Sequence, residues 1–378
     1  MNKVLKTKRL AFQLCLAAAL PSGLAMAQEA AVTPRPSPGQ APVQKAAPVD
    51  IAMESGQFEE ERQVQGANCS VRVHHPDAAV AKAAIPRALA EIARMLNQFG
   101  HNGRTAEVHS INVNAGADEV MVGPEAHALL QRALDLCRRT GGAYDPSIGS
   151  YDYLWDFKHR PFVRPLPQEL AAKRAAATCK NIVVKPSGAV RLLEPGLRVT
   201  LTGVATGVAL EKASHVLREA GVQNFRIRIG DDFYVQGRMG TRHWYAGLPN
   251  SRQPGDALGQ LYLSSHAAVT RSDSDRYVIK QGQRYHDVID PRSGSPAQGV
   301  VQVTIIAPDA VLADAYANAV FALGPKAGIA LIAKENGVEG VVVDSNGRIH
   351  ASKGLGDVAR VPERIELATP PAQSAQKF

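Results

Sequence analysis

Two side chains that carry oxygen atoms, Asp314 and Asn318, stand four residues apart in the apolar segment LADAYANAVFALG. On a helix this spacing puts both side chains on one face, where their oxygens can converge on one point. Oxygen ligands of this kind suit a hard cation such as Mg²⁺ or Ca²⁺ better than zinc. The neighbouring residues are mostly apolar, so we expect a buried helix whose carboxylate needs a partner. A metal ion would be such a partner.

The same segment also has a purely structural interpretation. Asp314 would cap the helix N-terminus by accepting a backbone amide of the first turn. Asn318 would then be an ordinary buried amide. The segment alone leaves both interpretations open, and residues elsewhere in the chain favour the metal.

The N-terminus has the pattern of a secretory signal peptide. Four basic residues precede the apolar run AFQLCLAAAL, and Ala25-Met26-Ala27 offers a small-residue cleavage site. We therefore expect residues 1–27 to be removed and the mature protein to be periplasmic. Cys15 lies inside the apolar run without the preceding small residues of a lipoprotein signal, which argues against a lipid anchor. No later stretch is apolar enough to predict a transmembrane segment in the mature chain.

Composition divides the remaining chain into three parts. Residues 28–55 are rich in Ala, Pro and Gln and predict a disordered linker, and residues 368–378 predict a disordered tail. Residues 56–367 form the expected folded domain. Within it, strands and helices mix without regular βαβ alternation, which predicts an α+β fold. The specific expectations include a strand at 66–73, a helix with Pro86 in its first turn, strands at 181–185 and 198–202, two short strands within 227–237, and a helix at 325–336.

Charge and cysteine content exclude several classes of protein. The formal net charge of +8 falls to +4 when the four basic residues of the leader are removed. Because no basic run is interleaved with aromatic residues, nucleic acid is not an expected partner. Three cysteines then remain, Cys69, Cys137 and Cys179, with no CxxC spacing, which excludes a zinc motif and a dense disulfide framework. One disulfide fits an oxidising compartment, and the sequence leaves the pair open.

Five blocks follow one another in order along the chain. They are GAYDPSIGSYDYLWDF, LTGVATG with a following Glu, IGDDFYVQG, SDRYVIKQGQRYHDVIDPRSGSP and LADAYANAVFALG. Together these blocks resemble the ApbE family of flavin transferases, and the resemblance covers about residues 60–350. The resemblance implies an ApbE-like, T-fold-related α+β fold of mixed sheets packed with helices. It also implies a Mg²⁺-dependent FAD:protein FMN transferase, which would attach FMN through a phosphoester to a Ser or Thr of a periplasmic or membrane flavoprotein and release AMP.

The matching positions also imply roles for individual residues. The implied metal ligands are the main-chain oxygen of Ala205 and the side chains of Asp314 and Asn318. The implied catalytic residues are His286, Asp287 and Arg271. The implied flavin-nucleotide contacts are Ala143, Tyr144, Asp145, Glu211, Thr270, Arg271 and Ser272.

Several positions depart from the family pattern. Thr206 stands where a Lys is common, Asp287 where a second His is usual, Asn318 where Thr or Asp is usual, and Arg271-Ser272 replace a Ser-Gly pair. The loss of a positioned charge at such a site costs a factor of roughly 10²–10³ in rate. Arg271 would restore a cation near the phosphates, and Asp287 would serve as the base or as an added metal ligand. The alternative is a catalytically impaired relative that binds FAD or a partner protein, or an FAD pyrophosphatase.

Overall fold

The structure is a computed structural model that describes residues 56–101, 106–157, 162–253, 255–365 and 367, and the backbone of 376–377. The described residues belong to one compact unit, Ala52–Phe378. The predicted leader and the linker at 28–55 lie outside the described residues. Of the predicted disordered tail, the structure describes only β19 (Gln376–Lys377), which pairs with β11 (Tyr277–Lys280).

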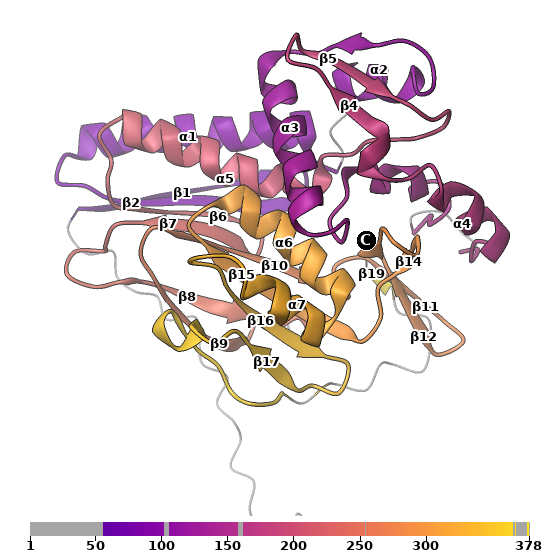
Figure 1. Cartoon of the computed structure of the whole chain (residues 1–378). Helices are drawn as coiled ribbons and strands as arrows, with labels where there is room; N and C mark the ends of the chain where they lie inside the picture. The colour runs from indigo at the N-terminus through magenta and orange to yellow at the C-terminus, as the bar shows by residue number, and fades with distance from the viewer. Residues whose placement is uncertain are drawn as a thin grey trace, which may run out of the picture. The chain divides into compact units, whose positions relative to one another are not determined.

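An antiparallel sheet of eight strands forms the centre of this unit, in the order β1-β2-β6-β7-β10-β15-β16-β17 (Figure 1). Every residue of β15, VVQVTIIA, is buried, because the sheet is covered on both faces. The strands are β1 (Gln57–Val64), β2 (Ala67–His74), β6 (Phe225–Ile229), β7 (Asp232–Gln236), β10 (His266–Ser272), β15 (Val300–Ala307), β16 (Glu339–Asp344) and β17 (Ile349–Ala351).

Helices cover one face of this sheet, and a smaller sheet covers the other. Helices α1 (Ala78–Phe99), α5 (Thr202–Glu219) and α6 (Ala310–Leu323) lie side by side on the first face, as Figure 1 shows, and α7 (Pro325–Ile332) follows α6. None of the described helices is both long and apolar enough to cross a membrane. The small sheet on the second face consists of β8 (Trp244–Pro249), β9 (Ala257–Leu263) and β18 (Ala359–Arg360).

The start of α6 decides between the two interpretations of its aspartate. Asp309 caps the helix by accepting the backbone N–H of Leu312 at 2.8 Å. Asp314 therefore lies in the second turn and is not the cap, and its side chain is fully buried. Gly207 of α5 allows the two helices to touch, since a Cβ at this position would lie 2.5 Å from the carbonyl oxygen of Ala310.

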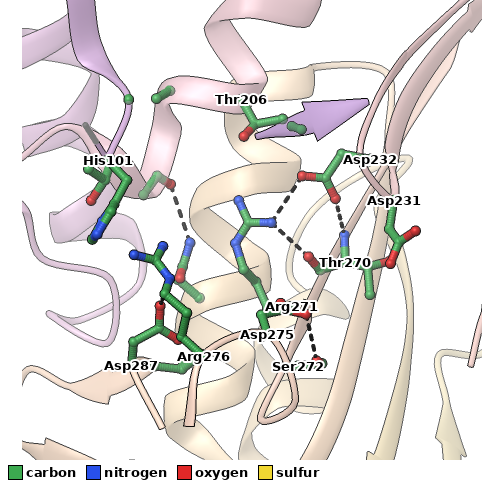
Figure 2. A pocket seen from close by; sticks show the side chains of 18 of the residues that line it. His101, Thr206, Asp231, Asp232, Thr270, Arg271, Ser272, Asp275, Arg276 and Asp287 are labelled. Carbon is green, nitrogen blue, oxygen red and sulfur yellow. Dashed lines mark hydrogen bonds and ion pairs between the residues drawn. The ribbon is translucent and has the colours of Figure 1, made fainter. Parts of the chain in front are cut away.

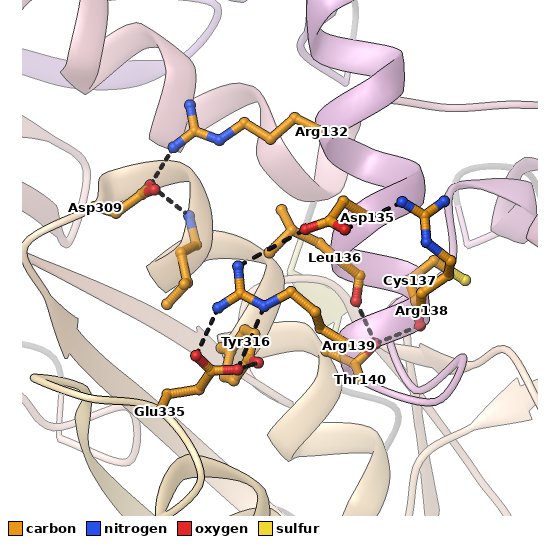
Figure 3. A network of polar contacts seen from close by, with 11 residues as sticks. Arg132, Asp135, Leu136, Cys137, Arg138, Arg139, Thr140, Asp309, Tyr316 and Glu335 are labelled. Carbon is orange, nitrogen blue, oxygen red and sulfur yellow. Dashed lines mark hydrogen bonds and ion pairs between the residues drawn. The ribbon is translucent and has the colours of Figure 1, made fainter. Parts of the chain in front are cut away.

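A second group of elements lies beside α6. It contains α3 (Pro124–Arg139), and a disulfide joins Cys137 at its end to Cys179. Arg139 of α3 pairs with Glu335 at 2.6 Å, and Arg132 pairs with Asp309 at the start of α6 (Figure 3). The other elements of this group are α2 (Ala106–Val113), β3 (Val120–Met121), η1 (Pro146–Tyr151), α4 (Pro167–Arg174), η2 (Cys179–Asn181), β4 (Ile182–Val184) and β5 (Ala189–Leu192).

The α+β prediction is confirmed, with two local corrections. Pro86 lies in the interior of α1 and not in its first turn, because Asp77 caps the helix and α1 begins at Ala78, eight residues before the proline. The strand expected at 198–202 is wrong, since residues 198–201 are irregular and α5 already begins at Thr202. The strands expected within 227–237 are β6 and β7, and the helix expected at 325–336 is α7.

Candidate functional site

A cavity of about 1900 Å³ opens where the N-terminal end of α5, the ends of β7 and β10, and the η1 segment meet. This volume exceeds the range of about 300–1,000 Å³ that is usual for small-molecule pockets, so a dinucleotide has room. The residues that line the cavity include Ala143, Tyr144, Asp145, Ala205, Thr206, Thr270, Arg271, Ser272, Arg276, Asp287 and Asn318.

Arg271 forms the charged centre of this cavity, as Figure 2 shows. Its Nη1 donates to Asp232 Oδ2 at 3.0 Å and to the main-chain oxygen of Thr270 at 2.7 Å, and its Nη2 donates to Asp314. The side chain of Asp314 is fully buried, and that of Arg271 is 18% exposed. Burial lowers the pKa of Arg271, but Asp314 and Asp232 more than offset this effect, so the guanidinium stays charged. The bridge therefore fixes one positive charge between two buried carboxyl groups.

The three predicted metal ligands lie near each other, but their oxygen atoms are not free to converge on one metal ion. Asp314 accepts the backbone N–H of Gly207 at 2.9 Å with Oδ2, and its Oδ1 accepts from Arg271. Asn318 donates its amide nitrogen to the main-chain oxygens of Asp314 and Gly203, at 2.9 and 3.3 Å. Ala205 lies within α5, whose carbonyls accept hydrogen bonds along the helix. These residues as placed do not fit a divalent metal ion.

Asp287 and His286 were both expected to be catalytic, and the structure separates them. Asp287 lines the cavity and pairs with Arg276 at 2.9 Å (Figure 2). Burial raises the pKa of Asp287 to about 6, within the range useful for a general base. Asp287 directly follows β12 (Gln283–His286), where successive side chains point to opposite sides.

The prediction of a catalytic role for His286 is therefore corrected. Its ring is 3% exposed, does not line the cavity, and stacks edge-on against Phe321 at 5.5 Å. Nε2 lies 2.9 Å from the main-chain oxygen of Ala297, which can only accept, so Nε2 carries the proton. Burial lowers the pKa of His286, which favours the neutral ring. The imidazole is a core group.

The predicted contacts Ala143, Tyr144 and Asp145 all line the cavity. The carboxylate of Asp145 accepts the backbone N–H groups of Ser147 and Cys179, both at 2.8 Å, so its oxygens hold the loop in place. The buried hydroxyl of Tyr144 has no hydrogen-bond partner among the described residues. Of Ala143, Tyr144 and Asp145, Tyr144 is therefore the residue whose side chain has an unused polar atom.

Of the remaining predicted contacts, two line the cavity and one does not. Thr270 donates its backbone N–H to Asp232 at 2.7 Å, and Ser272 Oγ donates to Asp275 at 3.1 Å. Glu211 does not line the cavity, which corrects that prediction. It lies more than a turn beyond Thr206 on α5 and pairs with Arg132 at 2.7 Å, with 42% of its side chain exposed.

The sequence predicted no role for three residues that the fold brings into the site. Asp232 was expected only in a turn, yet it is buried at the start of β7, where burial raises its pKa to about 7 despite Arg271. Arg276 belongs to the block SDRYV and pairs with Asp287. This pairing follows from the register of the β11–β12 hairpin, which the sequence did not reveal. Arg198 also lines the cavity and lies over the ring of Tyr153 at 4.7 Å.

Comparison with known proteins places these features in a family. The ApbE family model matches residues 65–342. A FAD:protein FMN transferase from Treponema pallidum is 28% identical over 321 residues, which cover 79% of this chain and 87% of the relative. A FAD:protein FMN transferase from Klebsiella pneumoniae is 26% identical over 248 residues, which cover 65% of this chain and 77% of the relative. The crystal structure of the ApbE protein from Thermotoga maritima superimposes with a TM-score of 0.72 at 27% identity, covering 80% of this chain and 99% of that one.

Proposed function

The chain belongs to the ApbE family, and from that premise we propose that it is a FAD:protein FMN transferase, the activity for which its relatives in Treponema pallidum and Klebsiella pneumoniae are named. The substrate would be FAD, and the acceptor would be a Ser or Thr hydroxyl of a flavoprotein. The observation that carries the proposal is one cavity with a carboxylate of raised pKa, Asp287, and a fixed guanidinium, Arg271, on its wall.

The proposed step exchanges one bond to phosphorus for another. The acceptor hydroxyl oxygen bonds to the phosphorus of the FMN half, the bond from that phosphorus to the bridging oxygen breaks, and AMP leaves with that oxygen. Asp287 takes the hydroxyl proton, and Arg276 at 2.9 Å holds its carboxylate in place. Arg271 donates hydrogen bonds to phosphate oxygens as charge develops on them.

The resemblance also predicts Mg²⁺ as a cofactor, and the step above does not use it. The oxygens of Asp314, the principal expected ligand, already accept hydrogen bonds from Arg271 and Gly207. The predicted flavin contacts Ala143, Tyr144, Thr270 and Ser272 stay part of the proposal as residues of the FAD cavity.

The activity test measures AMP and free FMN after incubation of the purified protein with FAD, with and without a hydroxyl-bearing acceptor flavoprotein. We expect AMP release, with FMN recovered on the acceptor as a mass increase. Asp287→Asn should lower AMP release, and Glu211→Gln, outside the cavity, should match wild type. AMP with an equal amount of free FMN would indicate a pyrophosphatase instead, and FAD bound but intact would indicate a flavin-binding relative.

We also propose that the mature protein is periplasmic, beginning at Gln28. Two observations support this location: the leader sequence with Ala25-Met26-Ala27, and the disulfide Cys137–Cys179, since disulfides persist in oxidising compartments. The test is the intact mass of the protein recovered from the periplasm of a bacterial host. A protein that keeps residues 1–27 and stays in the cytoplasm would contradict the proposal.

A further inference from the structure

At the position where the family resemblance places a divalent metal, this chain places a guanidinium. We infer that Arg271 takes the place of the metal ion, so that the chain binds and cleaves FAD without a divalent cation. The inference rests on the proposed function for its substrate. The ion pair between Arg271 and Asp314, with which the inference begins, does not depend on that function.

Metal binding at Asp314 Oδ1 would require its contact with Arg271 to break. Its two oxygens accept from Arg271 and from the backbone N–H of Gly207. A divalent ion at Oδ1 would displace the guanidinium, since two cations at contact distance repel strongly in a buried site. Displacement would also leave Asp232, whose side chain is 8% exposed, without its charged partner. The arrangement therefore favours the guanidinium over the ion.

Arg271 is held on several sides and does not depend on a ligand for its position. Asp232 accepts from Arg271 with Oδ2 and from the backbone N–H of Thr270 with Oδ1, so strands β7 and β10 are joined at the charge. The main-chain oxygen of Thr270 accepts a second hydrogen bond from Nη1. A guanidinium has five N–H donors. The hydrogen bonds to Asp232, to the main-chain oxygen of Thr270 and to Asp314 use three of them. The other two are available to phosphate oxygens in the cavity.

The two departures from the family pattern at this place are complementary. Thr206 replaces a long lysine at the start of α5, and it lies above Arg271 in the same cavity (Figure 2). The shorter side chain leaves space for the guanidinium that strand β10 supplies. Arg271 thus provides in one group the fixed positive charge near the phosphates that the lysine and the metal would otherwise provide. Arg276 and Arg198 add further positive charge to the cavity wall.

A Mn²⁺ titration followed by electron paramagnetic resonance tests this inference without any measurement of catalysis. Wild type, Asp314→Asn, Arg271→Ser and Arg271→Ser/Asp314→Asn are compared with and without FAD, with FAD alone as the control for Mn²⁺ bound by the nucleotide. We expect wild type and Asp314→Asn to leave the free Mn²⁺ signal equally undiminished. Arg271→Ser should take up one Mn²⁺ per chain, and the added Asp314→Asn change should abolish that uptake.

One stoichiometric Mn²⁺ on wild type that Asp314→Asn removes would overturn the inference, whether or not the Arg271 variants fold. AMP release gives a second readout. Chelator-treated wild type should keep its rate within about twofold with EDTA present, while a loss of tenfold or more that Mg²⁺ restores would also overturn it. If no AMP forms under either condition, the proposed function fails and the Mn²⁺ titration still decides the metal question.

Discussion

The substitution Arg271→Met removes the charge that separates two buried carboxyl groups and keeps most of the side-chain volume. The partner side chains are 8% exposed for Asp232 and 0% for Asp314. Removal of one member of a buried ion pair costs about 3–5 kcal/mol, because the remaining charge stays desolvated. For a domain of this size about 1 kcal/mol lowers the Tm by roughly 2 °C, so we expect a decrease of about 6–10 °C at pH 8.

The loss should depend on pH in a defined direction. Burial already raises the pKa of Asp232 to about 7 and raises that of Asp314, and loss of the guanidinium would raise both further. A carboxyl group whose pKa is higher in the folded than in the unfolded state binds more protons when folded. Its folded state therefore loses stability as pH rises above about 4 through the folded pKa. The difference between Arg271→Met and wild type should be largest at pH 8 and smaller at pH 5.

Thermal unfolding of the purified chain at both pH values measures this effect. Arg94→Met is the matched control, because Arg94 also bridges two carboxylates, Glu91 and Glu125, both at 2.7 Å, but is 45% exposed. We expect the control to lose less than about 1 kcal/mol. Adding Asp232→Asn and Asp314→Asn to Arg271→Met should restore more than half of the lost Tm. Equal losses for Arg271→Met and the control, or equal losses of Arg271→Met at pH 5 and pH 8, would refute the reasoning.

Three further predictions concern the site and its support. Asp287→Asn should lower AMP release by about 10²-fold or more. The wild-type rate should fall below pH 6, because Asp287, whose pKa is about 6, then takes up a proton. A flat wild-type pH profile would exclude Asp287 as the base. His286→Gln should keep AMP release within about threefold of wild type, against the roughly 10²-fold loss expected of a catalytic base, so a large loss in a folded variant would restore a catalytic role. Cys137→Ser/Cys179→Ser, which opens a loop with a sequence separation of 42, should lower the free energy of unfolding by about 4 kcal/mol, and chemical denaturation of wild type with and without reductant should show the same difference.

The sequence predicted the elements whose patterns are local. The helix in LADAYANAVFALG and the two short strands within 227–237 were predicted from local patterns, and α6, β6 and β7 occupy these segments. The helix start at Ala78 was missed because Pro86, a common first-turn residue, suggested a later start. The interior of a helix tolerates this proline here because packing of the apolar face outweighs its local cost.

The sequence predicted which residues share the site, but it did not predict the contacts between them. Family resemblance placed Asp287, Arg271 and Asp314 in one region, and they do line or border one cavity. Resemblance could not show that Asp314 is paired with Arg271, because that contact depends on how β10 packs against α6. The roles of His286 and Asp287 depend on which of two adjacent side chains faces the cavity, and only the strand orientation decides this.

The bridge between Cys137 and Cys179 has a practical consequence for how the protein is prepared. Cys179 also donates its backbone N–H to Asp145, so the disulfide ties the end of α3 to the loop that lines the cavity. Full-length chain kept in the cytosol of an expression host would carry four thiols, including Cys15 of the leader, whereas exported chain without residues 1–27 would carry one, Cys69. A thiol count under denaturing conditions should therefore accompany each activity measurement. If a reduced preparation is inactive, the missing disulfide explains the loss, and the loss is no evidence against the roles of the site residues.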